Sequence, residues 1–178
     1  MALRETAFWT PPRLEAPDNA DQINSSAAYG FIFDFCGVEV ERDSGRVRID
    51  KYVTMRDAGR ILNPALFDGQ VHGGFAQAIG AALYESFLYG EDGTFLSGNL
   101  ADYLVPTATE IPEPVILHRE TLSPVTPLGA KGIGEGNSMS TPVCLANAVA
   151  DALSIADLIL PLTPAKVSAF LGRARRAE

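Results

Sequence analysis

The residues with the clearest chemical potential lie in one glycine-rich loop, residues 129–136, whose sequence is GAKGIGEG. Four glycines among these eight residues allow backbone conformations that are closed to other residues and a close approach to a bound molecule. Glu135 stands between two of these glycines, so its neighbours give it little cover and the surrounding fold must set its position. A carboxylate that faces a closed cavity loses hydration and becomes a usable general base.

The same loop also fits less specific interpretations. Taken by itself, Glu135 is one of 22 acidic residues, and its local sequence favours a solvated loop carboxylate. The loop precedes a predicted helix, whose first N–H groups would favour an anion. A nucleotide-binding module is nevertheless disfavoured, because the loop has neither the GxGxxG spacing of a dinucleotide fingerprint nor the GK[ST] sequence of a Walker A loop.

A β-hairpin is predicted upstream of the loop. Residues 29–41 are aromatic and β-branched, residues 43–45 form a turn cluster, and residues 46–55 alternate apolar with polar side chains. This alternation places the odd-numbered apolar residues on one face. We expect the other face, which includes Tyr52 and Thr54, to meet water or another layer.

Three helices are also predicted. Asn63 and Pro64 suit the N-cap and the first position of a helix over residues 65–89. A second helix over residues 140–153 has so little polar surface that we expect it to be buried. A third begins at residues 163–164. Because regular βαβ alternation is missing, the predicted class is α+β, with a hairpin and short strands packed with three helices.

The N-terminal residues 1–26 differ from the rest of the chain. They are rich in Pro, Asn, Asp and Ala and predict an extended arm, while residues 27–178 form the domain itself. Short extended stretches are expected at residues 94–103 and 115–121. The apolar pair Phe8-Trp9 in the arm needs a partner surface.

Composition excludes several classes of protein. A net charge of -8 disfavours nucleic acid and anionic membranes as partners. The basic run Arg173, Arg175 and Arg176 is interpreted as a solvated helix end. Cys36 and Cys144 form no CxxC pair, so a disulfide framework, a zinc site and an iron–sulfur cluster held by this chain alone are all disfavoured. With no membrane-spanning run and no signal peptide, we expect a cytoplasmic protein.

Five short blocks stand in one order along the chain, among them GQVHGG at residues 69–74 and GAKGIGEG at residues 129–136. The blocks occupy residues 59–64, 69–74, 101–108, 127–136 and 146–153. This order resembles the C-terminal part of the molybdopterin-binding large subunit of molybdenum hydroxylases. That family includes xanthine dehydrogenase, aldehyde oxidoreductase and the carbon monoxide dehydrogenase large chain, and the resemblance covers nearly the whole chain.

The resemblance implies roles for individual residues. Glu135 corresponds to the active-site base beside molybdenum, which takes up a proton as an oxygen attacks an electron-poor carbon. Gln70, together with Gly132 and Gly134, corresponds to residues that contact the molybdenum cofactor, and no side chain of this chain is a metal ligand. Bacterial members imply the cytosine dinucleotide form of molybdopterin. The implied activity is oxidative hydroxylation of an aromatic N-heterocycle, an aldehyde or a related small molecule.

The family's large subunits are several times longer than this chain. The resemblance therefore implies partners: the remaining large-subunit portion, an iron–sulfur subunit and a flavin subunit, with the clusters and FAD held only in those partners. The alternative is a non-catalytic assembly fragment that keeps the fold without a complete cofactor site.

Other polar residues receive structural interpretations. His72 lacks a second ligand nearby and is assigned no metal. Asn147 and Asp151, four residues apart on the second helix, are expected to share a face and to anchor the glycine-rich loop. Lys131 is expected at the surface, and Cys144 is expected to be a small core residue.

Overall fold

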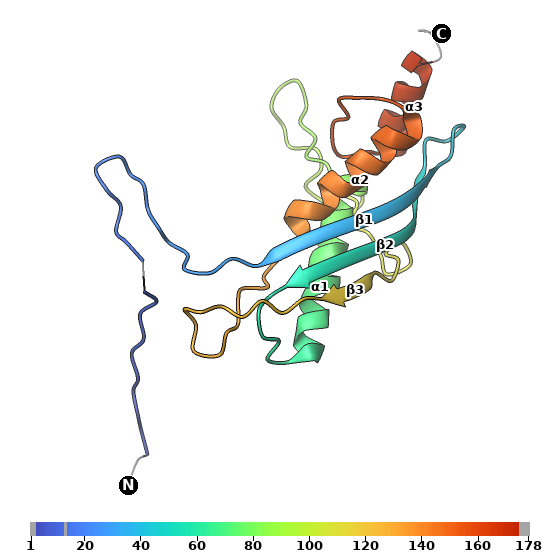
Figure 1. The fold of residues 1–178 in the computed structure, drawn as a ribbon. Coiled ribbons are helices and arrows are strands. Elements are labelled where there is room, and N and C mark those ends of the chain that lie inside the picture. Colours follow the sequence, from blue (N-terminus) through green and yellow to red (C-terminus); the bar gives the residue numbers. More distant parts are fainter. Residues whose placement is uncertain (1–2, 13, 175–178) are drawn as a thin grey trace.

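The structure, a computed structural model, describes residues 3–12 and 14–174 (Figure 1). Its elements follow in the order β1 (Phe31–Val40), β2 (Val47–Asp57), α1 (Pro64–Ile79), a π-helical turn η1 (Gly80–Tyr84), β3 (Val115–His118), α2 (Asn137–Leu153) and α3 (Pro164–Ala174). The predicted α+β class, with a hairpin and three helices, is confirmed. Of the two predicted extended stretches, one contains the strand β3, whereas residues 94–103 form turns and bends with an isolated bridge at Phe95. Arg175 and Arg176 of the basic run lie outside the described residues.

The three strands form one sheet in the order β1-β2-β3, with β1 antiparallel and β3 parallel to β2. The pairing of β1 with β2 shifts between Gly37 and Val38, which face Lys51 and Ile49, so Asp50 is an extra residue in β2. Such a bulge moves all later side chains to the opposite face of the strand.

The bulge overturns the predicted facing of β2. Ile49 is buried before it, and Tyr52, Thr54 and Arg56 are buried after it, whereas Met55 is exposed. The prediction that Ile49 shares one face with Val53 and Met55 is therefore wrong, whereas the face with Tyr52 and Thr54 meets another layer, the helices, which is one of its two expected environments. The inner face of the sheet thus carries polar side chains into the interior.

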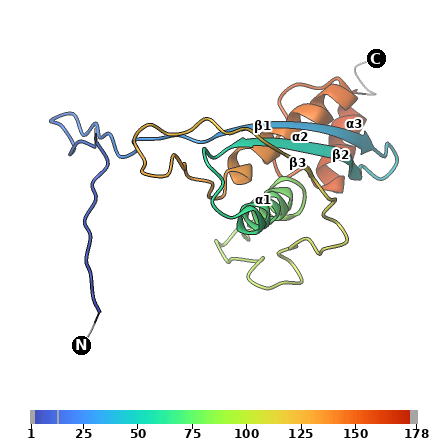
Figure 2. The same cartoon turned by 60° about the horizontal axis from the view of Figure 1, so that its bottom comes forward.

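The core lies between this inner face and the helices. The rings of Tyr52 on β2 and Phe75 on α1 lie 4.4 Å apart, and Leu145 and Val149 of α2 complete the cluster with Val167 of α3. Figure 2 shows β1 and β2 almost edge-on with α1 along one side of them. Burying these apolar side chains is the main stabilising term for the fold, at about 1.5–3 kcal/mol for each fully buried large side chain.

Helix α1 begins as predicted and ends earlier. The Asn63 side chain accepts a hydrogen bond from the N–H group of Leu66 at 3.2 Å, and Pro64 is the first helical residue. The helix was expected to reach residue 89, but the regular part ends at Ile79 and the chain becomes extended at Glu85. Gly80 follows Ile79, and glycine has a low helix propensity, which weakens the regular helix at this point.

Helix α2 is only partly buried. It starts at Asn137, three residues before the predicted start, and one stripe of it is buried, from Asn137 through Thr141 to Val149. Met139 and Val143 lie on another stripe and are 75% and 57% exposed. The expectation of a helix buried all round is wrong for this chain, because the described residues cover one side of α2 only.

The outer face of the sheet is apolar and open. Phe31, Phe33 and Phe35 of β1 are each more than half exposed, and the last two pair with Met55 and Val53 of β2. Val53 and Met55 in turn pair with residues of β3. We call this surface the outer sheet face; it consists of Phe31, Phe33, Phe35, Val53, Met55, Val115 and Leu117.

The N-terminal segment leads away from the sheet and helices (Figure 1). Its described residues before β1 contain no helix and only an isolated bridge between Glu15 and Asn24. Phe8 and Trp9 are exposed on it. The boundary at residue 26 stays a prediction. None of the helices in the described ranges has the length and apolar character needed to cross a bilayer.

Candidate cofactor site at the glycine-rich loop

The first half of the glycine-rich loop is attached to the end of β2. Gly59 and Ala130 form an isolated antiparallel bridge, in which the N–H group of Lys131 donates to the carbonyl of Ala58 at 2.7 Å. The carbonyl of Gly129 accepts a further hydrogen bond from the residue after Gly59. The loop therefore enters the site in a fixed register relative to the sheet.

The second half of the loop is held by a buried arginine. Arg56 is only 3% exposed; its Nη1 donates to the carbonyl of Ile133 at 3.1 Å, and its Nη2 donates to Oδ1 of Asn137. Burial lowers the pKa of Arg56, and the carboxylate of Asp34 opposes this effect. A Cβ atom at Gly136 would lie 2.7 Å from Nη1, so glycine allows the guanidinium to approach the backbone.

A buried polar network extends from this arginine into the core. Nδ2 of Asn137 lies 3.4 Å from Oγ1 of Thr54 and 3.3 Å from Oγ1 of Thr141. The hydroxyl of Tyr52 lies 2.8 Å from the same Thr141 oxygen and 2.7 Å from Oδ2 of Asp34. Burial raises the pKa of Tyr52, so its hydroxyl stays neutral. These hydrogen bonds link β1, β2 and α2, although Oδ1 of Asp34 and Nε of Arg56 are buried without a partner among the described residues.

Sequence reasoning missed this network. The signal was present in two spacings: Tyr52, Thr54 and Arg56 alternate on one strand, and Asn137 and Thr141 are four residues apart on one helix. The prediction that Asn147 and Asp151 anchor the glycine-rich loop is wrong, because both residues are exposed. The residues of α2 that anchor the loop lie instead on its buried stripe, which includes Asn137 and Thr141.

Helix α1 touches the loop from the other side. A Cβ atom at Gly74 would lie 3.7 Å from Cα of Glu135 and 3.7 Å from Cβ of Asn137. Gln70 is one turn earlier on the same helix face and is exposed. The structure thus places Gln70 one turn away from the point where α1 contacts the loop.

Three of the four predicted site residues line one cavity of about 430 Å³. Its walls are residues 30–32, residues 56–58, residues 132–136 and Met139. Gly132, Gly134 and Glu135 are among them, and Gln70 is not. The Glu135 side chain is exposed at this cavity, so the chain alone does not enclose its carboxylate.

The loop glycines border open space. A Cβ atom at Gly132 or Gly134 would meet no atom of the described residues within 4 Å, apart from its own chain neighbours, and Gly134 has a positive φ of 24°. The N–H groups of Gly132, Ile133 and Gly134 make no backbone hydrogen bond within the part of the chain that the structure describes. Free N–H groups beside a helix N-terminus suit phosphate and other oxygen-rich groups, which is the chemistry of a pterin cofactor with a phosphate tail.

Lys131 forms an ion pair with Asp57 of β2. Its Nζ lies 3.3 Å from Oδ2 of Asp57, both side chains are about nine-tenths buried, and the ammonium lies 5.5 Å from the centre of the Phe31 ring. Burial alone would raise the pKa of Asp57, but hydrogen bonds from Gly59, Thr121 and Lys131 hold it below its ordinary value. The expected surface lysine is therefore wrong, and Lys131 fixes the loop to β2.

Residues 1–112, more than half of the chain, match the family of molybdopterin cofactor-binding domains. The chain belongs to this family.

Similar proteins extend the match across the loop region. The chain is 36% identical over 165 residues to the gamma subunit of the 6-hydroxypseudooxynicotine dehydrogenase complex of Paenarthrobacter nicotinovorans, a match that covers 90% of this chain and 20% of the relative. It is 35% identical to the carbon monoxide dehydrogenase large chain of Afipia carboxidovorans, over 79% of this chain and 17% of that one. Aldehyde oxidoreductase from Desulfovibrio gigas superposes with a TM-score of 0.82 and 30% identity, over 92% of this chain and 18% of that one.

These relatives confirm the resemblance to molybdopterin-binding large subunits of molybdenum hydroxylases, and they are oxidoreductases by name. The chain spans about a fifth of the length of these relatives. A molybdopterin-binding chain of this size therefore corresponds to one part of such a subunit.

Two glycines of this molybdopterin-binding chain are expected to differ in how much stability an alanine costs. At Gly136 an added Cβ would overlap Cδ1 of Ile32 and crowd Arg56, so Gly136→Ala should lower the free energy of unfolding by about 1–3 kcal/mol. At Gly132 nothing in the chain obstructs a Cβ, so Gly132→Ala should change it by less than about 0.5 kcal/mol. Urea denaturation of both variants checks this; equal losses would show that the two sites are misassigned.

His72 in this chain has two protein partners. Its Nε2 lies 2.9 Å from Oε1 of Glu113, and its Nδ1 lies 2.8 Å from the carbonyl of Asp68. The hydrogen bond with Glu113 raises the pKa of His72 most. Burial lowers this pKa, and the hydrogen bond with the Asp68 carbonyl raises it further. His72 therefore ties α1 to the segment that precedes β3.

The His72 pair predicts a pH-dependent stability. Because the folded pKa is raised, its contribution is fully present below the unfolded value of about 6.5 and is lost as the pH rises through the folded value. Both side chains are exposed, so Glu113→Gln should destabilise by only about 0.5 kcal/mol at low pH and by nothing at high pH. Urea midpoints at about pH 5.5 and 8.5 measure this; a loss that is the same at both would disprove the pairing.

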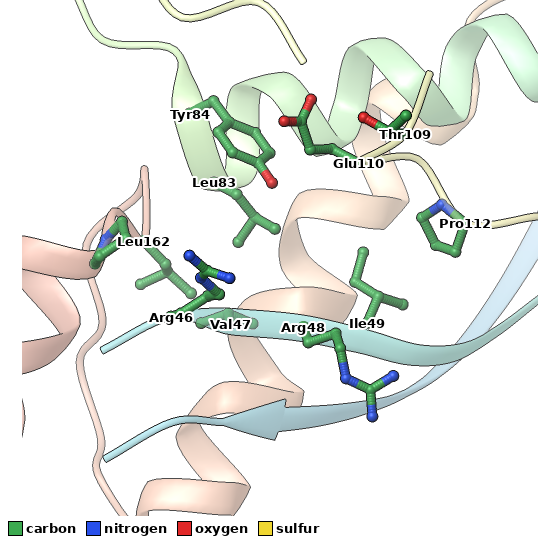
Figure 3. A pocket seen from close by; sticks show the side chains of 11 residues that line it. Arg46, Val47, Arg48, Ile49, Leu83, Tyr84, Thr109, Glu110, Pro112 and Leu162 are labelled. Carbon is green, nitrogen blue, oxygen red and sulfur yellow. The ribbon is translucent and has the colours of Figure 1, made fainter. Parts of the chain in front are cut away.

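A larger cavity, about 610 Å³, lies at the other end of the molybdopterin-binding chain (Figure 3). Figure 3 shows Tyr84 and Glu110 across the hollow from β2, while Arg48 is directed away from them. Arg48 is paired outside the cavity with Glu39 at 2.7 Å. None of the loop glycines lines this hollow, so its size alone does not mark it as the cofactor site.

Proposed function

We propose that this chain forms part of the molybdenum cofactor site of a multi-subunit molybdenum hydroxylase, with Glu135 as the active-site base. The observation that carries the proposal is the single cavity lined by Gly132, Gly134 and Glu135 in a chain of the molybdopterin-binding family. The residues there fit the group: Gly132 and Gly134 leave open space, and the N–H groups of Gly132, Ile133 and Gly134 lack backbone partners among the described residues.

Each residue has a defined task in this proposal. The backbone at Gly132 and Gly134 lets the cofactor approach and donates N–H groups to its oxygens. The carboxamide of Gln70 contacts the cofactor from α1. When bound, the molybdenum cofactor supplies the two-electron oxidation. The Glu135 carboxylate accepts the proton released by the oxygen nucleophile, and general bases of this kind typically contribute about 10²–10⁴ in rate.

A partner must close the site. Glu135 is exposed in this chain, whereas a base works best where water is excluded. The outer sheet face, the exposed stripe of α2 with Met139 and Val143, and Phe8 and Trp9 of the arm all present apolar surface. Contiguous exposed apolar surface of this kind is typical of an interface. We assign it to the remaining large-subunit portion, which the relatives carry in one longer chain.

The finer assignments are part of the same proposal. An iron–sulfur cluster needs four thiolates, more than the two cysteines of this chain, so we assign the clusters to an iron–sulfur subunit. We assign the flavin to a separate flavin subunit. The names of the relatives include a complex subunit and a large chain. We propose the cytosine dinucleotide form of molybdopterin, an electron-poor carbon as the point of attack, and a cytoplasmic location consistent with two free thiols.

Co-purification tests the proposal. The tagged chain is expressed together with the polypeptides encoded beside its gene, and molybdenum in the purified complex is measured by mass spectrometry. We expect about one molybdenum per large subunit, and a lower content for Gly132→Ala, which adds a methyl group to a residue that lines the cavity and meets no obstacle among the described residues. The contrary result is a folded chain that purifies alone and without molybdenum, although those polypeptides are co-expressed. That result would identify a non-catalytic assembly fragment.

A further inference from the structure

The two cysteines of the chain meet in the folded protein. Cys36 on β1 and Cys144 on α2 are 108 residues apart in the sequence, and their Sγ atoms lie 3.4 Å apart. Sγ of Cys36 also lies 3.5 Å from the carbonyl oxygen of Cys144. Both cysteines are free thiols and half-buried. Because the chain has only these two cysteines, any disulfide within it must join this pair.

In the chain without its partner, the pair is accessible to a small oxidant. Both cysteines line a groove of about 540 Å³ between β1 and α2, whose wall also includes Asp34, Met139 and Val143. A disulfide has a bond length of about 2.05 Å, so the sulfurs must come closer by roughly 1.4 Å. Neither thiol takes part in the cavity of Glu135.

We propose that Cys36 and Cys144 are an oxidative modification site, at which hydrogen peroxide converts the two thiols into a reversible disulfide that ties β1 to α2. The sulfur of Cys144 attacks one peroxide oxygen, breaks the O–O bond and becomes a sulfenic acid, while the other oxygen leaves as water after protonation. The sulfur of Cys36 then attacks the Cys144 sulfur and displaces the second oxygen as water. The thiols together lose two electrons and two protons, and the peroxide is reduced to two waters.

The surroundings assign different roles to the two thiols. The Sγ–H group of Cys36 donates to the carbonyl oxygen of Cys144 at 3.5 Å, which holds the proton on Cys36. The hydrogen bond between the two thiols lowers the pKa of Cys144, which favours the reactive thiolate there. The same hydrogen bond, burial and the nearby Asp34 raise the pKa of Cys36. Cys144 is therefore the attacking thiol and Cys36 the resolving one.

The cross-link would join elements that hold the cofactor loop. Cys36 follows Asp34 by two residues, Cys144 follows Thr141 by three, and the hydroxyl of Tyr52 lies within hydrogen-bond distance of both Asp34 and Thr141. Oxidation would thus fasten β1 to α2 beside the buried network that holds the loop.

Mass spectrometry of the full chain tests the proposal. After peroxide treatment and removal of the oxidant, we expect the intact mass to fall by about 2 Da, the count of titratable thiols to fall from two to zero, and dithiothreitol to restore both. Two thiols that stay titratable, a gain of oxygen without cross-linking, or a disulfide only between chains would each overturn it.

Two variants test the assigned roles. Serine keeps a hydroxyl donor in place of the thiol, so Cys36→Ser should leave Cys144 reactive and trapped as a sulfenic acid. In Cys144→Ser, a sulfenic-acid probe should label Cys36 at least about tenfold more slowly than it labels Cys144 in Cys36→Ser. The reverse order of labelling would overturn the assignment of Cys144 as the attacking thiol.

Discussion

Glu135→Gln will lower the turnover of the assembled enzyme by roughly 10²–10⁴-fold and leave its molybdenum content unchanged. Glutamine has the size of glutamate and keeps an acceptor oxygen, but it cannot take up a proton at neutral pH. The glycines and N–H groups of the loop are untouched by the substitution, so cofactor binding should persist. Steady-state turnover and metal content, measured on the same preparation, check both halves of the expectation.

A matched variant controls for the loss of charge. Glu91 is exposed in the turn before residue 94 and lies outside the residues that line the cavity. Glu91→Gln removes the same charge and should leave turnover at the level of the unmodified enzyme. Undiminished turnover in Glu135→Gln would show that Glu135 is not the active-site base. Loss of molybdenum from that variant would show that Glu135 binds the cofactor instead.

Asn137→Ala will lower the free energy of unfolding by roughly 2–4 kcal/mol. The substitution removes the oxygen that accepts from Nη2 of Arg56 and leaves that charge buried. Nε of Arg56 already has no partner among the described residues, so the guanidinium has little reserve of hydrogen bonds. Urea unfolding, followed by circular dichroism, measures the change.

The same helix supplies the control. Asn147→Ala makes the same chemical change at an exposed position of α2 and should cost less than about 0.5 kcal/mol. The double variant Arg56→Met with Asn137→Leu should cost less than the sum of its single variants, because the guanidinium and its acceptor are removed together. Additive losses, or equal losses for Asn137→Ala and Asn147→Ala, would contradict the anchoring role of the network.

Features set by short-range chemistry could be predicted from the sequence. The start of α1 follows from the side chain of Asn63 and the fixed φ of Pro64, which act within one turn. The hairpin follows from alternation and a turn cluster, which also act within a few residues. Each of these signals lies within a few residues of the feature that it predicts.

Features set by contacts between distant segments could not be predicted. The inner face of β2 depends on the bulge opposite Gly37, which a strict alternation cannot reveal. Arg56 and Asn137 are 81 residues apart, and neither residue type alone indicates a buried pair. The pairing of Cys36 with Cys144 is hidden in the same way, because only the packing of α2 on β1 brings the two sulfurs together.

An anomalous-difference map of the assembled enzyme, recorded at the molybdenum absorption edge, tests the central claim most directly. We predict a molybdenum peak beside the cavity lined by Gly132, Gly134 and Glu135, with the partner chain closing its open side. A peak at the larger cavity near Tyr84 and Glu110, or a partner side chain filling the glycine-lined cavity, would contradict the proposed cofactor site.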